Sequence, residues 1–388
     1  MSGSLTILFT NIWLERHAGS EVVLRDLAVG ALRRGHRPIV YTPAIGAFAQ
    51  QLTRRGIAVV DDLRRIADPP DIIHAHHVVP CGEAIIRFPG VPAIEVCHSF
   101  DHWVEAPAHF PEVAAYVAVD EACRDRLVHA HGIDPARVVM LHNAVDLARI
   151  PPRPRPLADR PRSAVVFGKA TSVPAIRAAC EALSIELETL GPQVGREVED
   201  PERHLVEVDL VFASARAALE GLCCGCAVIA CDARGLAGMV TSENFAALRA
   251  KNFGVRSLTR PITAQALIGE IGRYDRDDAR AVGERARGEA DLERQLDAFA
   301  GLYAKAIESS RAAPVSPAAH QEAVVRFLRD YLPRLGDPRW PALAEREAFT
   351  ERVRALEAEL AMVNRSRLLK LGRWLRRLRA TWLRWPRA

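Results

Sequence analysis

Short apolar runs of strand length alternate along this chain with longer stretches of helical periodicity, and a proline-rich segment near the middle interrupts the alternation. This pattern is typical of βαβ units, which build parallel sheets. Seven runs before the interruption predict the strands of one sheet, at residues 5–9, 38–41, 58–60, 71–75, 93–97, 115–119 and 138–141. Residues 20–34 carry apolar side chains on one helical face and end in Arg33-Arg34-Gly35, a common helix terminus.

The interruption, Pro151-Pro152-Arg153-Pro154-Arg155-Pro156, predicts a linker, because proline lacks a backbone N–H and fits neither a helix interior nor a central strand. We place this linker at 151–162, between Rossmann-like domains at 1–150 and 163–310. Strands of the second domain are expected at 164–167, 185–187, 208–212 and 227–231, with helices near 174–183 and from Ala215. A second break at 311–317 precedes a helical extension at 319–388. The length of 388 residues fits two α/β domains and an appendage.

Composition indicates a cytoplasmic globular protein. No stretch approaches the roughly 18 apolar residues of a membrane span, and residues 1–10 lack the features of a signal peptide. The eight cysteines are expected to be buried thiols, since a chain of this size needs no disulfide framework. The group Cys223, Cys224, Cys226 and Cys231 lacks the paired C-x-x-C spacing of zinc sites.

The basic character of the chain is confined to its end. Residues 364–388 contain nine Lys and Arg and no acid, so subtracting them from the net charge of +4 leaves −5 on residues 1–363. This distribution argues against a nucleic-acid partner and for one surface that binds anions. Apolar residues recur at helical spacing within the basic segment, which predicts an interfacial helix on the inner face of a membrane. The alternative is a coiled coil that continues from residue 349 and allows self-association.

Candidate ligand-binding residues of the first domain follow its strands. Gly19 and Ser20 precede a helix, where backbone N–H groups and the helix dipole attract a phosphate; an ordinary helix cap is the alternative. His74 and His76 close one strand, and His98 with Asp101 follows another. A metal is disfavoured, because a third ligand at suitable spacing is missing. The pair of His98 and Asp101 fits an acid, a base or a positioning group, or else a plain polar pair at a strand end.

In the second domain, Lys169 directly follows a strand and can neutralise a diphosphate. Glu220 lies on a helix that is followed by a glycine and a buried strand, and its carboxylate can accept hydrogen bonds from two ribose hydroxyls. The glycine-containing run after that strand is expected to let phosphates approach its backbone closely. Its members are Gly235, Leu236, Ala237, Gly238 and Met239.

Taken in order, four segments resemble glycosyltransferase family 4, the retaining GT-B enzymes, over about residues 5–309. They are Gly19-Ser20-Glu21 with Arg34-Gly35-His36, Asp71 to His76, His142 to Asp146, and Ala218-Leu219-Glu220 through Asp232. The resemblance implies two Rossmann-like domains facing a cleft. A UDP- or GDP-sugar would bind the C-terminal domain, and a glycan or lipid-linked acceptor would bind the N-terminal domain, on the side of His74 and His76.

The resemblance also implies residue roles. Glu220 would hold the ribose, Lys169 the diphosphate, and Gly19 would approach the phosphates. His98 would lie near the transferred sugar. No metal and no cofactor besides the nucleotide-sugar co-substrate is expected, because cations and backbone donors stabilise the leaving diphosphate.

Two departures from the family pattern keep another function open. A second glutamate is common eight residues before the ribose-binding one, where this chain has Phe212, and the loop at 213–216 is shortened. Only Arg177, at some distance, can serve as the second basic residue expected after Lys169. The alternative is a non-catalytic GT-B-like protein that binds a nucleotide or glycan and works in assembly. A nicotinamide-dependent oxidoreductase is disfavoured, because residues 12–19 lack its glycine fingerprint.

Overall fold

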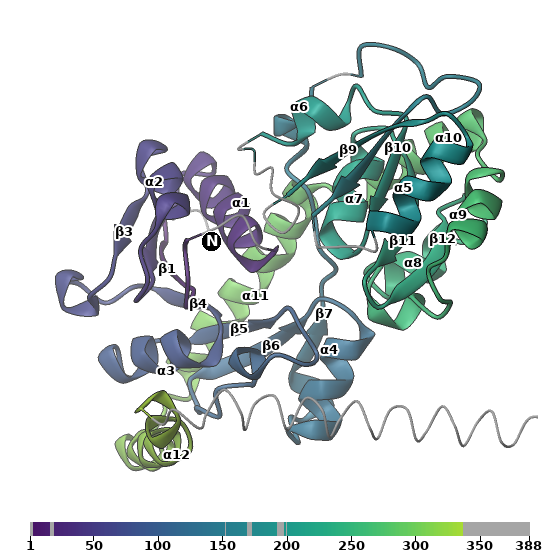
Figure 1. Cartoon of the computed structure of the whole chain (residues 1–388). Helices are drawn as coiled ribbons and strands as arrows, with labels where there is room; N and C mark the ends of the chain where they lie inside the picture. The colour runs from purple at the N-terminus through teal and green to yellow at the C-terminus, as the bar shows by residue number, and fades with distance from the viewer. Residues whose placement is uncertain are drawn as a thin grey trace, which may run out of the picture. The chain divides into compact units, whose positions relative to one another are not determined.

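A computed structural model gives the fold (Figure 1). It describes residues 3–15, 19–151, 153–168, 173–191, 198 and 200–336, with the backbone alone for 332–336. Lys169 and the basic segment 364–388 lie outside the described residues, as does the apolar periodicity from residue 349, so the predictions made for them stay predictions.

Among the described residues, seven strands form a fully parallel N-terminal sheet in the order β3-β2-β1-β4-β5-β6-β7. Each of the seven predicted strands is confirmed to within two residues at either end. The bounds are β1 (Thr6–Thr10), β2 (Arg37–Tyr41), β3 (Ala58–Val60), β4 (Ile72–His76), β5 (Ala93–Cys97), β6 (Val113–Ala118) and β7 (Val138–Met140).

The N-terminal helices connect these strands. The helix expected at 20–34 is confirmed as α1 (Gly19–Arg33). The others are α2 (Ala47–Arg54), α3 (Val78–Arg87) and α4 (Glu121–Asp125), with short turns η1 (Leu63–Arg65), η2 (Trp103–Glu105), η3 (Arg126–Ala130), η4 (Pro135–Arg137) and η5 (Leu147–Arg149).

The C-terminal sheet has the order β12-β11-β10-β8-β9, and only β12 runs antiparallel to its neighbour. Its strands are β8 (Ser163–Phe167), β9 (Glu186–Leu190), β10 (Leu210–Ala213), β11 (Ala227–Asp232) and β12 (Gly235–Met239). Four of them match predicted strands. The fifth, β12, was not predicted, and in it the run of small residues pairs with β11 as an edge strand. The approach of phosphates to this run stays a prediction.

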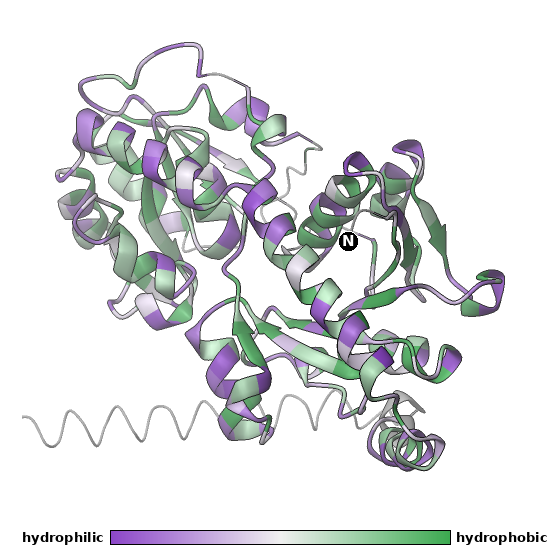
Figure 2. Ribbon diagram, turned by 180° about the vertical axis from the view of Figure 1, so that it is seen from behind, coloured by the Kyte–Doolittle hydropathy of each residue, from purple (hydrophilic) through white to green (hydrophobic). Residues whose placement is uncertain are grey.

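The helices after the linker are α5 (Val173–Ala182), α6 (Glu202–Leu205), α7 (Ala215–Cys223), α8 (Phe245–Ala250), η6 (Val255–Ser257), α9 (Ala264–Ile271), α10 (Arg276–Glu289), α11 (Leu292–Ala312) and α12 (Pro317–Gly336). Apolar residues gather on the strands and on the inward faces of the helices, with hydrophilic residues on the outer faces (Figure 2). All eight cysteines are buried free thiols, as predicted.

Phe212 of β10 is completely buried in the core of the C-terminal domain. The loop between β10 and α7 is so short that a count of eight residues back from Glu220 reaches the interior of the strand. A side chain at this position therefore packs within the domain and does not reach a ligand.

Helix α11 returns from the C-terminal domain and packs on the N-terminal sheet, against β4, β5 and β6 (Figure 1). Its Phe299 and Tyr303 lie against His74 of β4. Leu296 fills the space beside Gly30 of α1, where an added Cβ would lie 2.5 Å from its Cδ1. The sequence analysis assigned residues 292–310 of α11 to the C-terminal domain, whereas this helix packs against strands of the N-terminal sheet.

The first part of α12 also docks on the N-terminal domain. The ring of Phe327 lies 5.5 Å from that of Phe110 and covers Gly82, where a Cβ would lie 2.3 Å from the Phe327 Cζ. His320 Nδ1 lies 2.5 Å from the buried Glu112 Oε1. From Leu328 onward α12 belongs to a second compact unit, together with residues 101–103. None of the helices in the described ranges is long and apolar enough to cross a membrane.

We predict that Phe327→Ala lowers the free energy of unfolding by about 3 kcal/mol, because it removes a buried aromatic ring from the α12 contact. Val325→Ala on the same helix, at a position 62% exposed, is the control and should change this free energy by less than about 0.5 kcal/mol. Urea unfolding of both variants measures the difference. Equal effects would show that α12 is not held by this contact.

Candidate functional site

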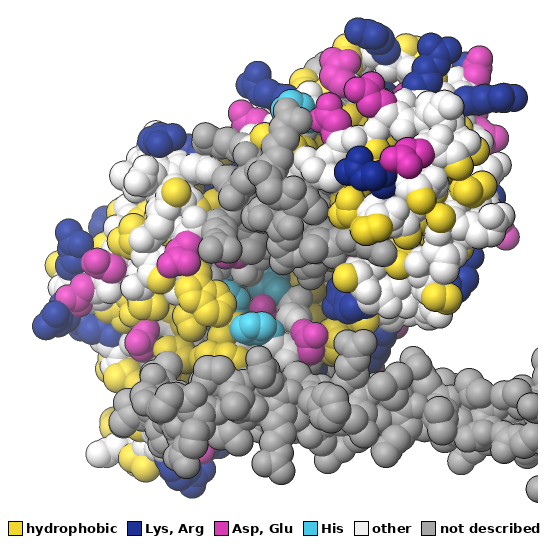
Figure 3. All heavy atoms as spheres, in the orientation of Figure 1, with side chains coloured by type: hydrophobic (Ala, Val, Ile, Leu, Met, Phe, Trp, Pro, Cys, Tyr) yellow, Lys and Arg dark blue, Asp and Glu magenta, His cyan; other side chains and the backbone are white. Residues whose placement is uncertain are grey.

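Histidines gather at the carboxyl ends of β4 and β5, the edge at which open α/β sheets bind ligands. His74 and His76 are fully buried, and His98 is partly exposed. Nδ1 of His76 lies 2.6 Å from Nε2 of His98, with the two rings inclined by only 8°. Nδ1 of His74 lies 2.6 Å from the hydroxyl of Tyr303. The space-filling view shows histidine side chains together with acidic ones in a recess of the surface (Figure 3).

The prediction that His74 and His76 lie on the acceptor side stays a prediction. Both side chains have no exposed surface, because α11 covers His74 and His98 lies against His76. His98 is the member of this stack that a substrate can reach.

The carboxylate beside His98 belongs to Glu105, which the sequence analysis missed. Its Oε2 accepts a hydrogen bond from the backbone N of His98 at 2.7 Å, and its Oε1 lies 3.4 Å from Nε2 of His77. Nδ1 of His77 accepts from the backbone N of Ile12, so the proton of a neutral His77 is on Nε2, facing Glu105. Although burial opposes ionisation, the hydrogen bond from His77 and the neighbouring charges lower the pKa of Glu105.

Asp101, the carboxylate expected beside His98, is exposed and belongs to the second unit of the chain. Its catalytic role stays a prediction. Glu105 could not be predicted from the sequence, because it lies in the 3₁₀ turn η2. A turn of three residues is too short to show a hydrophobic periodicity.

Gly19 and Ser20 form the beginning of α1, as predicted. Gly19 is exposed, and a Cβ on it would meet no described atom within 4 Å. The Ser20 hydroxyl donates to Oε2 of Glu21 at 2.9 Å. Glu21 is buried, and burial raises its pKa.

The ring nitrogen of His98 that carries the proton can be assigned from its contact with the buried His76. Nε2 of His76 has no hydrogen-bond partner among the described residues. A buried N–H without an acceptor is rarer than a buried acceptor without a donor, so the proton of His76 belongs on Nδ1. His76 Nδ1–H then donates to Nε2 of His98, and His98 carries its own proton on Nδ1. His98 therefore offers a hydrogen-bond donor at Nδ1.

We predict that ring-nitrogen NMR of protein labelled with ¹⁵N-histidine finds His98 protonated on Nδ1, with His98→Ala used to assign its signals. His76→Asn keeps a hydrogen-bond donor near the position of Nδ1 and should preserve this tautomer of His98. His76→Leu removes the donor, so His98 should then populate both neutral tautomers. Protonation of His98 on Nε2 in the unmodified protein would contradict the assignment.

Burial keeps the three histidines neutral. It lowers the pKa of His74 to about 3 and that of His98 to about 4, and it holds the pKa of His76 well below its usual range. The unfolded chain binds these protons at a pKa near 6.5. Between about pH 6.5 and 4 the unfolded state thus binds more protons, so stability falls as the pH falls.

We predict that each of these histidines contributes up to about 1.4 kcal/mol per pH unit to this loss below pH 6.5. His74→Asn, which cannot titrate, should flatten the dependence of the unfolding free energy on pH between 6 and 4.5. The matched control is His129→Asn, at an exposed position. Urea unfolding at several pH values measures the slopes, and an unchanged slope in His74→Asn would show that His74 is protonated in the folded protein.

A second group of charges surrounds Arg216, at the start of α7. This buried guanidinium donates to Asp26 of α1, to Oε1 of Glu220 at 3.0 Å and to the backbone oxygen of Ala144 at 2.7 Å. It thereby joins α1 of the first domain to α7 of the second and fixes one oxygen of Glu220. Burial opposes ionisation of Glu220 and raises its pKa, while Arg216 counteracts that rise.

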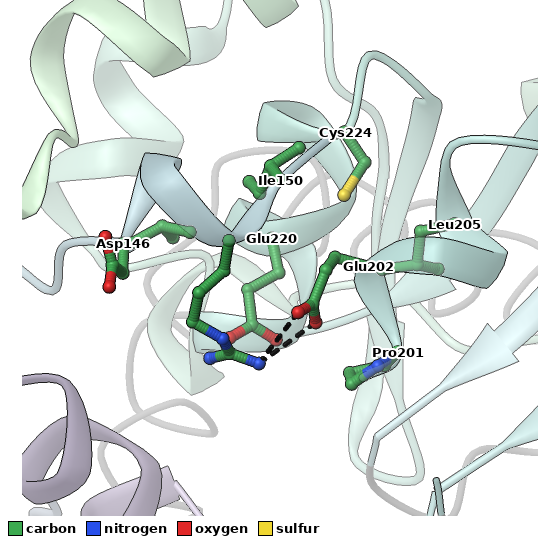
Figure 4. A pocket seen from close by; sticks show the side chains of 9 residues that line it. Asp146, Ile150, Pro201, Glu202, Leu205, Glu220 and Cys224 are labelled. Atoms are coloured by element: carbon green, nitrogen blue, oxygen red, sulfur yellow. Dashed lines mark hydrogen bonds and ion pairs between the residues drawn. The ribbon is translucent and has the colours of Figure 1, made fainter. Parts of the chain in front are cut away.

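Glu220 lines a small pocket where the segment 145–150, α6 and α7 meet (Figure 4). Arg149 crosses this pocket. Its Nη1 lies 3.3 Å from Oδ1 of Asp26, and its Nη2 lies 3.0 Å from both carboxylate oxygens of Glu202. The complete lining is Val145, Asp146, Arg149, Ile150, Pro201, Glu202, Leu205, Glu220 and Cys224.

The residues Gly235 to Met239, expected to approach phosphates, use backbone donors within the protein. The amide of Leu236 donates to the oxygen of Arg260 at 2.8 Å, and the amide of Met239 donates to Oε2 of Glu270 at 2.8 Å. A Cβ on Gly238 would lie 2.5 Å from Glu270 Oε2. The absence of a side chain at Gly238 therefore makes room for Glu270.

Arg149, Glu202 and Arg216 were also missed from the sequence. Arg216 stands four residues before Glu220 on one helix, a spacing that places the two side chains together and that the sequence does show. Arg149 and Glu202 come from different segments and meet only in the folded chain. The described residues contain no group of three or more His, Cys, Asp or Glu side chains that could hold a metal ion.

Comparison with known proteins agrees with this architecture. Residues 17–149 match the model described as Glycosyltransferase Family 4. The resemblance predicted from the sequence is confirmed for these residues. The matched region contains α1 and the histidine stack of β4 and β5.

Solved structures show that the chain has the fold of GT-B glycosyltransferases. A glycosyltransferase from Rickettsia africae ESF-5 aligns with a TM-score of 0.56 at 14% identity, over 78% of this chain and 99% of that one. Alr3699/HepE of Anabaena, in complex with UDP and glucose, aligns with a TM-score of 0.56 at 16% identity, over 78% and 100%. The same protein in complex with UDP-glucose aligns with a TM-score of 0.52 at 16% identity, over 79% of this chain and 100% of that one. No curated protein matches the chain significantly.

Proposed function

We propose that this protein transfers a sugar from a nucleotide-diphosphate sugar, with UDP or GDP as the nucleotide, to a glycan or lipid-linked acceptor. The observation that carries the proposal is the carboxylate of Glu220, which lines a pocket and is oriented by Arg216. A carboxylate with one oxygen held in this way can accept the hydroxyls of a ribose.

The proposed division of roles follows the two domains. The C-terminal domain holds the nucleotide through Glu220, and Lys169 neutralises the diphosphate, as the family resemblance implies. His98 of the N-terminal domain donates from Nδ1 to the transferred sugar or to the acceptor. Cations and backbone donors stabilise the diphosphate as it leaves, so the proposal needs no metal. Retention of anomeric configuration rests on the family resemblance.

The basic segment 364–388 supports a location at the cytoplasmic face of a membrane. Its nine cations attract anionic headgroups, and its apolar residues favour insertion at the interface. In this proposal the segment brings a lipid-linked or cell-surface polysaccharide acceptor close to the enzyme.

Phe212 supports a second candidate function, non-catalytic binding of a nucleotide or glycan. Its buried side chain stands where family members commonly have a sugar-contacting glutamate. Release of free nucleotide diphosphate from a nucleotide sugar in the presence of acceptor distinguishes the candidates, because only a transferase produces it.

We predict that Glu220→Gln weakens binding of the cognate nucleotide diphosphate by about 10- to 100-fold, the value of hydrogen bonds to a charged group. Glu207→Gln, which removes an exposed carboxylate of the same domain outside the pocket, should leave the affinity unchanged. Isothermal titration with UDP and with GDP measures both variants, and circular dichroism verifies their folding. Equal affinity in Glu220→Gln and the unmodified protein would remove Glu220 from the nucleotide site.

A further inference from the structure

His77, directly after β4, has an unusual backbone conformation. Its φ of 70° and ψ of 133° lie outside the regions that a residue with a Cβ favours, so this conformation costs free energy. The residue is also buried. A strained conformation persists only where the surrounding contacts impose it, and such residues cluster at functional sites. The contacts of the His77 ring therefore show what imposes the strain.

The imidazole of His77 uses both of its nitrogens. Nδ1 accepts a hydrogen bond from the backbone N of Ile12 at 3.3 Å, and Nε2 lies 3.4 Å from Oε1 of Glu105. Ile12 follows β1 and Glu105 belongs to the turn η2, so the ring connects two segments that are far apart in the chain. Because each nitrogen has its own partner, the neutral ring is limited to one tautomer and one orientation.

Glu105 extends this connection to His98. Its second oxygen, Oε2, accepts a hydrogen bond from the backbone N of His98 at 2.7 Å, a short distance typical of charge-assisted hydrogen bonds. The carboxylate is buried and has a contact at each oxygen, so it cannot turn without losing one of them. His98 is the first residue after β5 and lies beyond the paired residues of that strand. The carboxylate therefore fixes the backbone of His98 at a point where strand pairing has ended.

We propose that His77 is a positioning residue for His98 and acts through Glu105. His77 orients the carboxylate, the carboxylate fixes the backbone of His98, and the ring of His98 is thereby directed towards the transferred sugar or the acceptor. The inference rests on the proposed function only for what His98 contacts, because the contacts from His77 to His98 involve no substrate. The competing explanation is that His77 merely tolerates the sharp turn between β4 and α3.

Two substitutions of His77 separate these explanations. Asparagine tolerates positive φ better than most residues, and its amide lies near the position of Nδ1, so His77→Asn can keep the contact with Ile12 but cannot reach Glu105. Glutamine places its amide nitrogen near the position of Nε2, so His77→Gln can keep the donor to Glu105. Backbone tolerance alone favours the asparagine variant, whereas positioning of His98 favours the glutamine variant. The matched controls are His129→Asn and His129→Gln, at a side chain that is 73% exposed.

The measurement is NMR of the full chain labelled with ¹⁵N-histidine, in which His98→Ala assigns the backbone and ring signals of His98. We expect hydrogen exchange of the His98 amide to be at least about 10-fold faster in His77→Asn and to change by less than about threefold in His77→Gln, because only glutamine keeps the donor that orients Glu105. The ring-nitrogen signals of His98 should shift in His77→Asn and stay in place in His77→Gln. Both variants of His129 should leave all of these signals unchanged.

Two outcomes overturn the inference. An unchanged exchange rate in His77→Asn would show that His77 does not fix the backbone of His98. Faster exchange in His77→Gln than in His77→Asn would show that His77 serves the turn alone. If neither variant folds, the ring of His77 in the unmodified protein decides, since a proton on its Nδ1 excludes the contact with Ile12 and rejects the proposal. Failure of the protein to bind UDP and GDP rejects the proposed function, whereas the exchange rates need no ligand and judge the positioning separately.

Discussion

A buried cation, Arg216, is one of the groups that connect the two domains. Its guanidinium contacts Asp26 of α1, Glu220 of α7 and the backbone oxygen of Ala144 near the end of the first domain. A charge removed from water is tolerated only when its hydrogen bonds are satisfied, and removal of one partner leaves the others buried and uncompensated. The same contacts fix Glu220, and Asp26 also anchors Arg149. Arg216 thus orients Glu220 directly and, through Asp26, also supports Arg149, which holds Glu202.

The histidine stack shows how burial can determine a chemical role. His76 lies in the interior and stays neutral, and it contacts His98 through the Nε2 atom of that residue. The low pKa of His98 also keeps it uncharged near neutral pH, so it donates a hydrogen bond without adding a positive charge. Positive charge around the pocket comes instead from arginines, whose guanidinium groups stay protonated when buried.

Much of the fold could be predicted from the sequence. Eleven of the twelve described strands were placed from their apolar runs, and the helices α1, α5 and α7 from their periodicity or position. The strand β12 was missed, because its glycines and small side chains resemble a loop and its pairing with β11 is a long-range contact. Of the site, His98 and Glu220 were found by their positions after a strand and on a helix. The sequence did not predict the roles of Glu105, Arg149 and Glu202. Each of them meets its partners only through a turn or through a segment distant in the chain.

The sequence by itself determined the α/β class and the resemblance to glycosyltransferase family 4 over residues 17–149, since these follow from local periodicity and short motifs. The tertiary structure decided which polar groups are exposed and which are paired. It buried His74 beneath α11, placed Phe212 in the core and set Glu202 against Arg149. Solvent exposure and charge pairing depend on contacts between residues far apart in the chain, and local sequence does not encode them.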